Sequence, residues 1–439
     1  MPILYKNALK KQDPAVHALI EQEHTRQEEE INLIASENAV SEAVLAATAC
    51  IMTNKYAEGY PGKRYYAGCA HVDSVEELAL ERVHALFGAE HANVQPHSGS
   101  QANAAVLRSF LTYGDVILGM DLAAGGHLTH GHKMNFSGKD YTVFSYGVDP
   151  QTELLDYEAI ERIALDCKPK VIIAGGSAYA RTIDFERFAA IAQKAGARLW
   201  VDMAHIAGLV AAGLHPNPVP YADYVTFTTH KTMRGPRGGV ILCKKIYAKE
   251  IDREVMPGTQ GGPKMNEIAA KAVAFHLALQ PEFKAYQAQV IRNAQAMVDE
   301  FKQCGFKIVS DGTDTHLFLV DIPSKGINGF KGKEAEALLQ SVGIVTNKNC
   351  LPFDTTAWSP NGIRIGTPTI TTRGMKEAEA RFIVQLINKA IERHQDVEVL
   401  TSIAAAVRGL ALQFPVYCHT EKDNASGQRG TPVEQSTGI

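Results

Sequence analysis

Short apolar runs alternate with segments of helical periodicity between about residue 92 and residue 242. The apolar runs have the length of β-strands and lie at residues 116–120, 171–174, 199–202, 224–228 and 240–242. Apolar positions recur at helical spacing in residues 101–111 and 185–196. Strands that alternate with helices predict an α/β fold with a mostly parallel sheet and helices on both faces. In such a sheet, ligands bind at the carboxyl ends of the strands.

The remainder of the chain predicts a smaller α+β domain and two terminal extensions. Long helical patterns at 265–279 and 281–305 precede a strand pattern at 317–322 and helical patterns at 333–342 and 376–394. The last 20 residues are polar and rich in Ser, Thr, Gly and Gln, which is typical of disorder. We expect four parts: an N-terminal helical arm (1–35), a large domain (36–280), a small C-terminal domain that includes the connecting helix (281–419), and a disordered tail (420–439).

Charge and cysteine usage exclude several classes of function. The net charge is −4, from 44 basic and 48 acidic residues, so we expect no nucleic-acid or membrane partner. The seven cysteines include no CxxC pair, which indicates neither a zinc site nor a disulfide framework, and we expect no metal. The N-terminus lacks the apolar segment of a signal peptide, and the apolar run 206–214 is too short to cross a bilayer. These features predict a cytoplasmic protein.

A lysine at the end of one predicted strand is the first candidate for chemistry. Lys231 follows the run 224–228 within the segment TTHKT, so its side chain can project into the ligand crevice. An amine in that place can hold an aldehyde cofactor as an imine. Taken alone, an ordinary solvated loop lysine is the commoner interpretation.

Asp202 strengthens the chemical interpretation of Lys231. It ends the run 199–202, and its separation of 29 positions from Lys231 leaves room for one further crossover. A carboxylate there can keep the pyridine nitrogen of a cofactor protonated. The structural alternative is a helix N-cap, which is common after a strand. His205, three residues further on, either reaches the cofactor or braces the site.

Two glycine-containing loops are candidates for binding an anion. Ser98 and Gly99 lie in the segment HSGSQAN directly before a predicted helix, where backbone N–H groups and the helix dipole favour a phosphate. Gly261 and Gly262 precede a second predicted helix and add further donors. A Gly/Ser loop by itself is more often a plain turn.

Arg364 and an aromatic loop complete the set of candidates. Arg364 lies between apolar neighbours in NGIRIGTP, where it is suited to bidentate recognition of an amino-acid carboxylate, with a salt bridge between domains as the alternative. The loop 55–66 gathers tyrosines and Glu58 around Gly and Pro residues. Such a loop, without core periodicity, is more often functional than structural.

Six longer strings resemble the serine hydroxymethyltransferase family, in the family's order and across nearly the whole chain. They are YAEGYPGKRYYAGC, VQPHSGSQAN, GGHLTHG, VDMAHIAGLVAAG, TTHKTMRGPRGG and NGIRIGTP. The resemblance implies a fold-type I enzyme with pyridoxal 5′-phosphate bound covalently at Lys231. It implies the reversible conversion of serine and tetrahydrofolate to glycine and 5,10-methylenetetrahydrofolate.

The resemblance also implies roles for individual residues. Cofactor contacts would come from Lys231, Asp202 at the pyridine nitrogen, His127 stacked on the ring, His205 and Ser177 at the phenolic oxygen, Ser98 and Gly99 at the phosphate, and Tyr56, Gly261 and Gly262. Substrate contacts would come from Ser36, Tyr66, Glu58 and Arg364, with Glu58 transferring a proton and His230 fixing reaction specificity. Folate contacts would come from Leu122, Gly126, His127, Leu128 and Asn349.

In this family, residues equivalent to Tyr56, Glu58, Tyr66, Gly261 and Gly262 reach across from the neighbouring subunit, which implies an obligatory homodimer. Three departures from the family pattern stand out: Gly176 where an aromatic residue is more usual, a shortened loop with Trp358 near the folate site, and the polar tail. The rival hypotheses are a threonine aldolase or aminotransferase of the same fold, and a non-catalytic protein that binds RNA.

Overall fold

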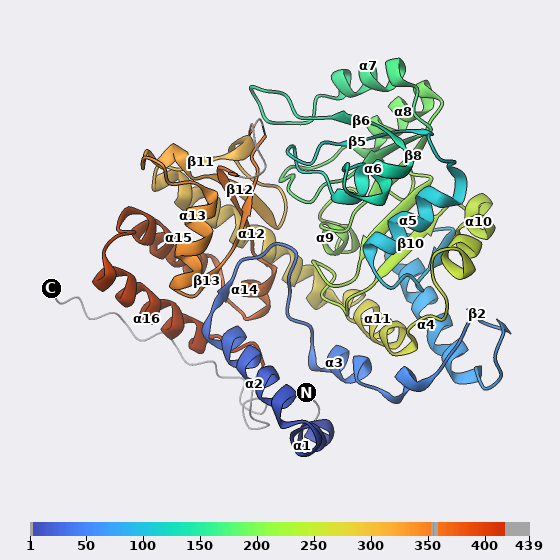
Figure 1. The fold of residues 1–439 in the computed structure, drawn as a ribbon, viewed down its shortest axis with the longest axis horizontal. Coiled ribbons are helices and arrows are strands. Elements are labelled where there is room, and N and C mark those ends of the chain that lie inside the picture. The colour runs from blue at the N-terminus through green and yellow to red at the C-terminus, as the bar shows by residue number, and fades with distance from the viewer. Residues whose placement is uncertain (1–2, 353, 355–358, 418–439) are drawn as a thin grey trace.

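The computed structural model describes residues 3–352, 354 and 359–417. Figure 1 shows two lobes that lie side by side and are joined by the helix α12 (Pro281–Gln303). Phe283, at the start of α12, packs in the core of the large lobe, whereas Met297 and Phe301 pack in the core of the small lobe. One continuous helix therefore belongs to both hydrophobic cores, as the connecting helix predicted from the sequence requires.

A seven-stranded sheet forms the centre of the large lobe. In order across the sheet its strands are β4 (His91–Asn93), β10 (Gly239–Cys243), β9 (Tyr224–Thr228), β8 (Arg198–Asp202), β7 (Val171–Ala174), β5 (Val116–Met120) and β6 (Thr142–Tyr146). Only β10 runs antiparallel to its neighbours. The predicted α/β fold with a mostly parallel sheet is confirmed, and the predicted strands at 116–120, 171–174 and 224–228 have the observed bounds.

Alternation along the strands explains why the sheet is covered on both faces. In β8, Leu199 and Val201 belong to one hydrophobic core, and Trp200 between them belongs to another. Successive side chains of a strand point to opposite faces, so a strand buried on both sides is apolar throughout. The helices of the large lobe are α3 (Glu42–Thr48), α4 (Ala70–Phe87), α5 (Gly99–Phe110), α6 (Phe136–Asp140), α7 (Tyr157–Cys167), α8 (Phe185–Ala195), α9 (Ala207–Ala211), α10 (Ala248–Arg253) and α11 (Met265–Ala278).

The two faces carry different helices. Helix α5 packs on the face that contains Trp200, through Ala102, Ala105 and Val106. The opposite face buries residues of α4, α8 and α11, among them Val83 and Phe275. Because α5 begins next to the carboxyl ends of the parallel strands, its N-terminus points toward the edge where the sequence predicts the ligand site.

The small lobe is built around a four-stranded antiparallel sheet. Its strands are β11 (Lys307–Ile308), β12 (Leu317–Asp321), β15 (Gly362–Gly366) and β14 (Asn347–Asn349), in that order. Its helices are α13 (Gly332–Ser341), α14 (Pro368–Thr372), α15 (Glu377–Glu392) and α16 (Val397–Gln413). Four strands with helices segregated to their faces confirm the predicted smaller α+β domain.

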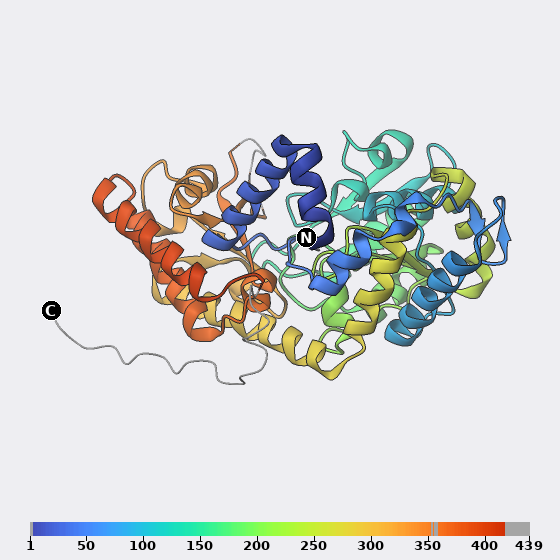
Figure 2. The same cartoon turned by 90° about the horizontal axis from the view of Figure 1, so that it is seen from below.

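The N-terminal segment lies against the small lobe (Figures 1 and 2). It comprises α1 (Ile3–Gln12), α2 (Pro14–Glu29) and the short strand β1 (Ile31–Asn32), which pairs in parallel with β13 (Ile344–Val345). Arg373 anchors the segment, because its guanidinium donates hydrogen bonds to backbone carbonyls of Gln27, Glu28 and Glu30. Among the described residues, no helix is both long enough and apolar enough to cross a membrane.

Candidate active site

A cleft of about 640 Å³ opens at the carboxyl ends of the parallel strands, between the two lobes. It brings together most of the residues predicted from the sequence: Ser36, Ser98, Gly99, Leu122, Gly126, His127, Leu128, Ser177, Asp202, His205, His230, Lys231, Asn349 and Arg364. These residues come from widely separated positions in the chain, and a sheet of this topology is what makes them neighbours.

Lys231 lies just beyond the end of β9, and only 9% of its surface is exposed. Its backbone carbonyl accepts a hydrogen bond from Asn38 at 3.2 Å, which fixes the backbone beneath the side chain. Burial lowers the pKa of the Lys231 ammonium to about 8, although the charge of Asp202 acts in the opposite direction. An amine with this pKa is partly neutral near neutral pH and is therefore available as a nucleophile.

Asp202 ends β8 and is held by three donors. Its Oδ2 accepts hydrogen bonds from Asn103 Nδ2 at 2.8 Å and from His130 Nε2 at 3.0 Å, and its Oδ1 accepts one from the Ala204 amide at 3.0 Å. Burial alone raises the pKa of Asp202, but the bond from His130 and the nearby charges of His127 and Lys231 outweigh it. The pKa lies below its ordinary value, so the carboxylate stays ionised inside the cleft.

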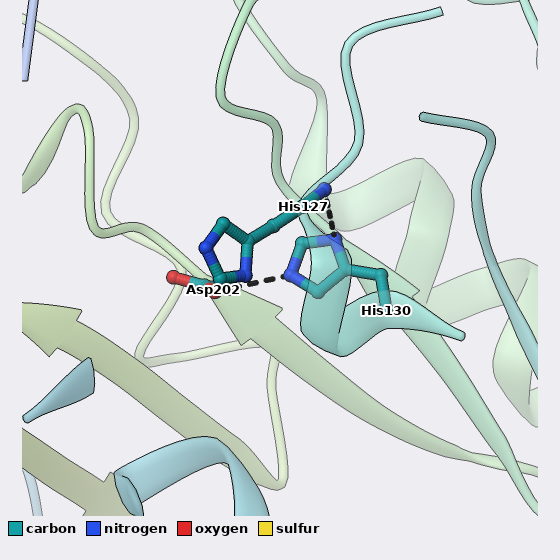
Figure 3. A group of neighbouring side chains, drawn as sticks. All are labelled: His127, His130 and Asp202. Atoms are coloured by element: carbon teal, nitrogen blue, oxygen red, sulfur yellow. Dashed lines mark hydrogen bonds and ion pairs between the residues drawn. The ribbon is translucent and has the colours of Figure 1, made fainter. Parts of the chain in front are cut away.

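The prediction from the sequence overlooked His130, although it named His127 in the same segment. Figure 3 shows both side chains beside Asp202, with the His130 ring bonded to the carboxylate. His130 Nδ1 accepts a hydrogen bond from the His127 amide at 3.2 Å, so its Nε2 carries the proton that it donates to Asp202. The string GGHLTHG contains both histidines, and their i, i+3 spacing in a tight turn was the available signal.

Asn103 was overlooked for a similar reason. It lies four residues after Gly99 on α5, so both residues share one face of that helix. Asn103 Nδ2 also contacts Thr129 Oγ1 at 2.8 Å, and Thr129 Oγ1 lies 2.8 Å from His127 Nδ1. These contacts join Asp202, His130 and His127 into one network that orients the His127 ring.

His127, His130 and Asp202 also have the composition of a metal site. Their potential donor atoms lie within 4.8 Å of one another. However, His127 Nδ1 accepts a hydrogen bond from the Thr129 amide at 3.2 Å, and His130 Nε2 donates to Asp202. A metal would have to displace both interactions, so the hydrogen-bonded network is the better description of the three residues.

His205 connects the cleft to the small lobe. Its Nδ1 lies 3.2 Å from Nε2 of His316, a residue directly before β12, and the two rings are stacked at 5.4 Å between centroids. Burial holds the pKa of His205 well below its ordinary value, and the charges of Lys231 and Arg364 act in the same direction. The neutral imidazole therefore has one nitrogen shared with His316 and one left for a ligand. The prediction from the sequence did not include His316.

The predicted anion loop lies at the N-terminus of α5. Ser98 is the N-cap of this helix, and its hydroxyl accepts a hydrogen bond from the Gln101 amide at 3.2 Å. A Cβ atom at Gly99 would lie 2.5 Å from Thr228 Cγ2, so only glycine lets α5 begin this close to the end of β9. The helix presents free N–H groups to the cleft directly beside the strand that leads to Lys231.

Arg364 enters the cleft from the small lobe. Its Nη1 donates to the carbonyl of Ser177 at 2.7 Å, and its Nε donates to Asn347 Oδ1 at 3.3 Å. Burial lowers the pKa of Arg364 to about 10, which still leaves the guanidinium charged at neutral pH. No carboxylate of the described residues forms a salt bridge with Arg364, so the structure does not support the alternative of a salt bridge between domains. The charge is available to an anionic ligand.

The five remaining predicted residues form a separate group, here called the arm patch: Tyr56, Glu58, Tyr66, Gly261 and Gly262. None of them is among the described residues that line the cleft. Tyr56 Oη donates to Glu58 Oε1 at 3.2 Å, and the rings of Tyr56 and Tyr66 meet edge to face at 5.2 Å. A Cβ at Gly262 would lie 3.3 Å from the Tyr56 ring. Tyr56 is 55% exposed and Tyr66 47%.

The arm patch has a rigid base. The strands β2 (Gly59–Tyr60) and β3 (Lys63–Arg64) form a pair, and Arg64 ends β3. Its guanidinium bridges Asp73 at 2.8 Å and Glu76 at 2.7 Å on α4. The Arg64 and Glu76 side chains are almost fully buried, so the loop is fixed to the body of the large lobe. The patch therefore faces outward as a preformed surface, although a loop of this composition could otherwise be mobile.

Comparison with known proteins identifies the family. The model of the serine hydroxymethyltransferase family matches residues 9–387. A serine hydroxymethyltransferase from Acidobacterium capsulatum is 56% identical over 417 residues, which cover 95% of this chain and 97% of that protein. The chain belongs to the serine hydroxymethyltransferase family. Serine hydroxymethyltransferases are pyridoxal phosphate-dependent one-carbon transferases that act on serine and a folate, so the predicted family and class of reaction are confirmed.

The cleft fits pyridoxal phosphate by the chemistry of its donors. The buried amine of Lys231 suits the aldehyde, and the ionised carboxylate of Asp202 suits the protonated pyridine nitrogen. The N-terminus of α5 suits the phosphate. In addition, Nδ1 of His230 is buried without a hydrogen-bond partner among the described residues. A buried polar atom of this kind is satisfied when a ligand occupies the space beside it.

Proposed function

We propose that the cleft binds pyridoxal phosphate at Lys231 and catalyses the reversible transfer of the hydroxymethyl group of serine to tetrahydrofolate, which supports one-carbon metabolism and glycine biosynthesis in the cytoplasm. The observation that carries this proposal is the buried, ionised Asp202 in the same cleft as the buried amine of Lys231. Burying both groups is unfavourable without a function for them, and structural positions seldom retain such a pair.

When bound, pyridoxal phosphate supplies an electron sink for the electron pair left at Cα as the Cα–Cβ bond of serine breaks. Asp202 would hold the proton on the pyridine nitrogen, and the network of His130 and Asn103 would keep that carboxylate ionised. His127 would cover the ring, and His205 and Ser177 would hydrogen-bond the phenolic oxygen. The N-cap Ser98 and Gly99 would bind the phosphate.

Substrate orientation would depend on Arg364, which is half-buried, charged and unpaired with any described carboxylate. Its guanidinium would hold the serine carboxylate in a bidentate pair with help from Ser36 on the cleft wall. Orientation matters because only the bond held perpendicular to the cofactor ring is activated. His230 follows β9 directly beside Lys231, and burial lowers its pKa to about 3, so it would act as a neutral imidazole in fixing reaction specificity.

The folate would enter over an apolar rim of the cleft. Leu122 and Leu128 are 40% and 46% exposed there, which is a large apolar area for a cleft mouth, and Gly126 and Asn349 line the same wall. A flat aromatic ligand gains most from such surfaces. Gly176 lies nearby, where an added Cβ would approach the Gly125 carbonyl to 3.0 Å, so this backbone leaves little room for a side chain. Trp358 lies outside the described residues.

The arm patch would complete the active site of a second copy of the chain. Glu58 would transfer the proton at the serine hydroxymethyl group, Tyr66 would bind the substrate carboxylate, and Tyr56, Gly261 and Gly262 would contact the cofactor. A cavity of about 420 Å³ adjoins the cleft and shares Ser36 and His230 with it, which gives the partner subunit a path to the reacting groups. The proposed functional unit is therefore a homodimer.

A spectroscopic titration tests the proposed reaction. Glycine added to the holoenzyme, followed by tetrahydrofolate, is expected to generate a long-wavelength absorption band that depends on the folate. If glycine binds and folate leaves the spectrum unchanged, the transferase proposal fails. Folate-independent cleavage of β-hydroxy amino acids as the only turnover would instead support a threonine aldolase of this fold.

A further inference from the structure

A buried lysine outside the cleft has no part in the mechanism described above. Lys271 lies on α11 and is 1% exposed. Its Nζ donates hydrogen bonds to three backbone carbonyls: Val94 at 2.7 Å, Pro96 at 3.1 Å and Gly239 at 2.9 Å. Burying a charge away from water is unfavourable unless hydrogen bonds compensate it, and these three bonds supply that compensation.

The carbonyls held by Lys271 belong to the two segments that build the anion loop. Val94 and Pro96 lie between β4 and the N-cap Ser98, and Gly239 begins β10. The Gly239 amide also donates to the Pro96 carbonyl at 3.1 Å, so the two segments are tied to each other as well as to the lysine.

Glycine contacts carry this restraint to the loop itself. A Cβ at Gly239 would lie 2.3 Å from the Ser98 carbonyl oxygen and 3.0 Å from the Gly99 nitrogen, so β10 packs directly on the Ser98–Gly99 peptide. A Cβ at Gly238 would lie 2.4 Å from Lys271 Cε, so the lysine stem packs equally closely behind it. The backbone of Gly238 and Gly239 thus lies between Lys271 and the Ser98–Gly99 groups that would bind the phosphate.

The number of acceptors indicates the protonated form of Lys271. A neutral amine has two N–H donors, whereas an ammonium has three, which matches the three carbonyls. Burial lowers the pKa of Lys271 to about 7, while the carboxylates of Glu267 and Glu76 act in the opposite direction. The positive charge would also favour an anion on the far side of the Ser98–Gly99 peptide.

We propose that Lys271 is a positioning residue for the phosphate of the cofactor: it fixes the backbone that aims the Ser98 and Gly99 donors and adds an attractive buried charge behind them. This inference rests on the proposed function, in which the phosphate binds at Ser98 and Gly99. It assigns a ligand-binding role to a residue that touches no ligand.

The test is Lys271→Met, which keeps an unbranched side chain that is one atom shorter and removes the charge and the three hydrogen bonds. Affinities of the apoprotein for pyridoxal phosphate and for pyridoxal, which lacks the phosphate, are measured by equilibrium dialysis. We expect the variant to bind pyridoxal phosphate about 10- to 100-fold more weakly and pyridoxal within about twofold of the wild type.

Arg373→Met is the matched control. Arg373 is also a buried cation, and among the described residues its hydrogen bonds go to backbone carbonyls alone, those of Gln27, Glu28, Glu30, Ala411 and Phe414. These carbonyls belong to the small lobe and its N-terminal segment. The loss of Arg373 is expected to lower the thermal midpoint without changing the preference for pyridoxal phosphate over pyridoxal. A general loss of stability would affect both variants alike.

The outcomes separate the two proposals. If the wild type does not prefer pyridoxal phosphate to pyridoxal, the phosphate site itself is wrong. If the wild type has the preference and Lys271→Met keeps it, only the role of Lys271 is refuted. Should Lys271→Met fail to fold, Gly239→Ala tests the same contact, since its methyl group must displace the Ser98 carbonyl. Gly239→Ala that retains the full preference would overturn the inference.

Discussion

The cleft and the arm patch belong to one proposed active site, yet their residues differ in burial and in the neighbours that hold them. In the cleft, Lys231 and Asp202 are buried, their pKa values are lowered, and each is held by neighbours from other elements. In the arm patch, Tyr56 and Tyr66 are about half exposed, and Glu58 has its hydrogen bond with Tyr56. In the proposed homodimer, one subunit would supply the imine lysine, the carboxylate and the phosphate site, and the second subunit would supply proton transfer and further cofactor contacts.

The cleft should show the largest effect of a single substitution. Asp202→Asn keeps the size of the side chain, but it removes the charge opposite the pyridine nitrogen and replaces one of the two acceptor oxygens with an NH2 group. Turnover with serine and tetrahydrofolate is therefore expected to fall roughly a thousandfold or more. Steady-state kinetics at saturating cofactor measures it. Asp184→Asn is the control, because Asp184 is the N-cap of α8, where asparagine caps equally well. The N-cap of the helix that follows β8 is Ile206, so Asp202 does not cap that helix. Equal and small effects in both variants would show that Asp202 has no role at the cofactor.

Within the arm patch, Glu58 should affect catalysis without affecting cofactor binding. Glu58→Gln removes the proposed proton-transfer group, so folate-dependent serine cleavage is expected to fall roughly 100- to 1000-fold. Equilibrium dialysis should give an unchanged affinity for pyridoxal phosphate, since Glu58 is assigned to the hydroxymethyl group of serine and not to the cofactor. Turnover close to that of the wild type would remove Glu58 from its role.

A smaller effect is expected at the substrate carboxylate. Tyr66→Phe removes one hydrogen bond to a charged group, which should raise the KM for serine by about tenfold and leave kcat nearly unchanged. Its neighbour Tyr65 is the control, because Tyr65→Phe alters a residue of the same loop to which no substrate contact is assigned. Identical kinetics of the two variants would show that Tyr66 does not bind the substrate carboxylate.

The smallest expected effect is the pH dependence of the rate at which the apoprotein captures the cofactor. Because the neutral amine of Lys231 is the nucleophile and burial lowers its pKa to about 8, the rate of cofactor capture by the apoprotein should rise through about pH 8 and level off above it. Asp202 raises this pKa, so Asp202→Asn should move the midpoint to lower pH. Stopped-flow absorbance follows the capture. A rate that still increases steeply toward pH 10 would indicate an ordinary lysine.

The sequence predicted the buried strands well and the exposed elements poorly. Strand β5 was predicted at its observed bounds because it is apolar and almost entirely buried. Strand β6 was overlooked, since it lies at the edge of the sheet and exposes Thr142, Phe144 and Ser145. An edge strand has no apolar run, so periodicity does not reveal it. The domain bounds stay a prediction, and the predicted tail lies outside the described residues.

The sequence predicted site residues that would contact a ligand and overlooked residues that contact another side chain of the site. Lys231, Asp202 and Arg364 were predicted because their chemistry is visible at the end of a strand or in a family string. His130 and His316 act through another side chain, Asp202 and His205 respectively. Such roles depend on proximity between distant elements, which spacing along a single sequence does not express. The separation of the arm patch from the cleft, by contrast, is what the resemblance implied when it assigned these five residues to the neighbouring subunit.

Subunit complementation tests the central claim most directly. Lys231→Ala and Glu58→Gln are each expected to have little or no activity as homodimers, whereas a mixed dimer would have one site with an intact Lys231 and the intact Glu58 of its other subunit. After equal amounts are unfolded together and refolded with cofactor, about a quarter of wild-type activity should return, because half the dimers are mixed and each has one working site. Activity no greater than that of the separate variants would contradict the shared active site.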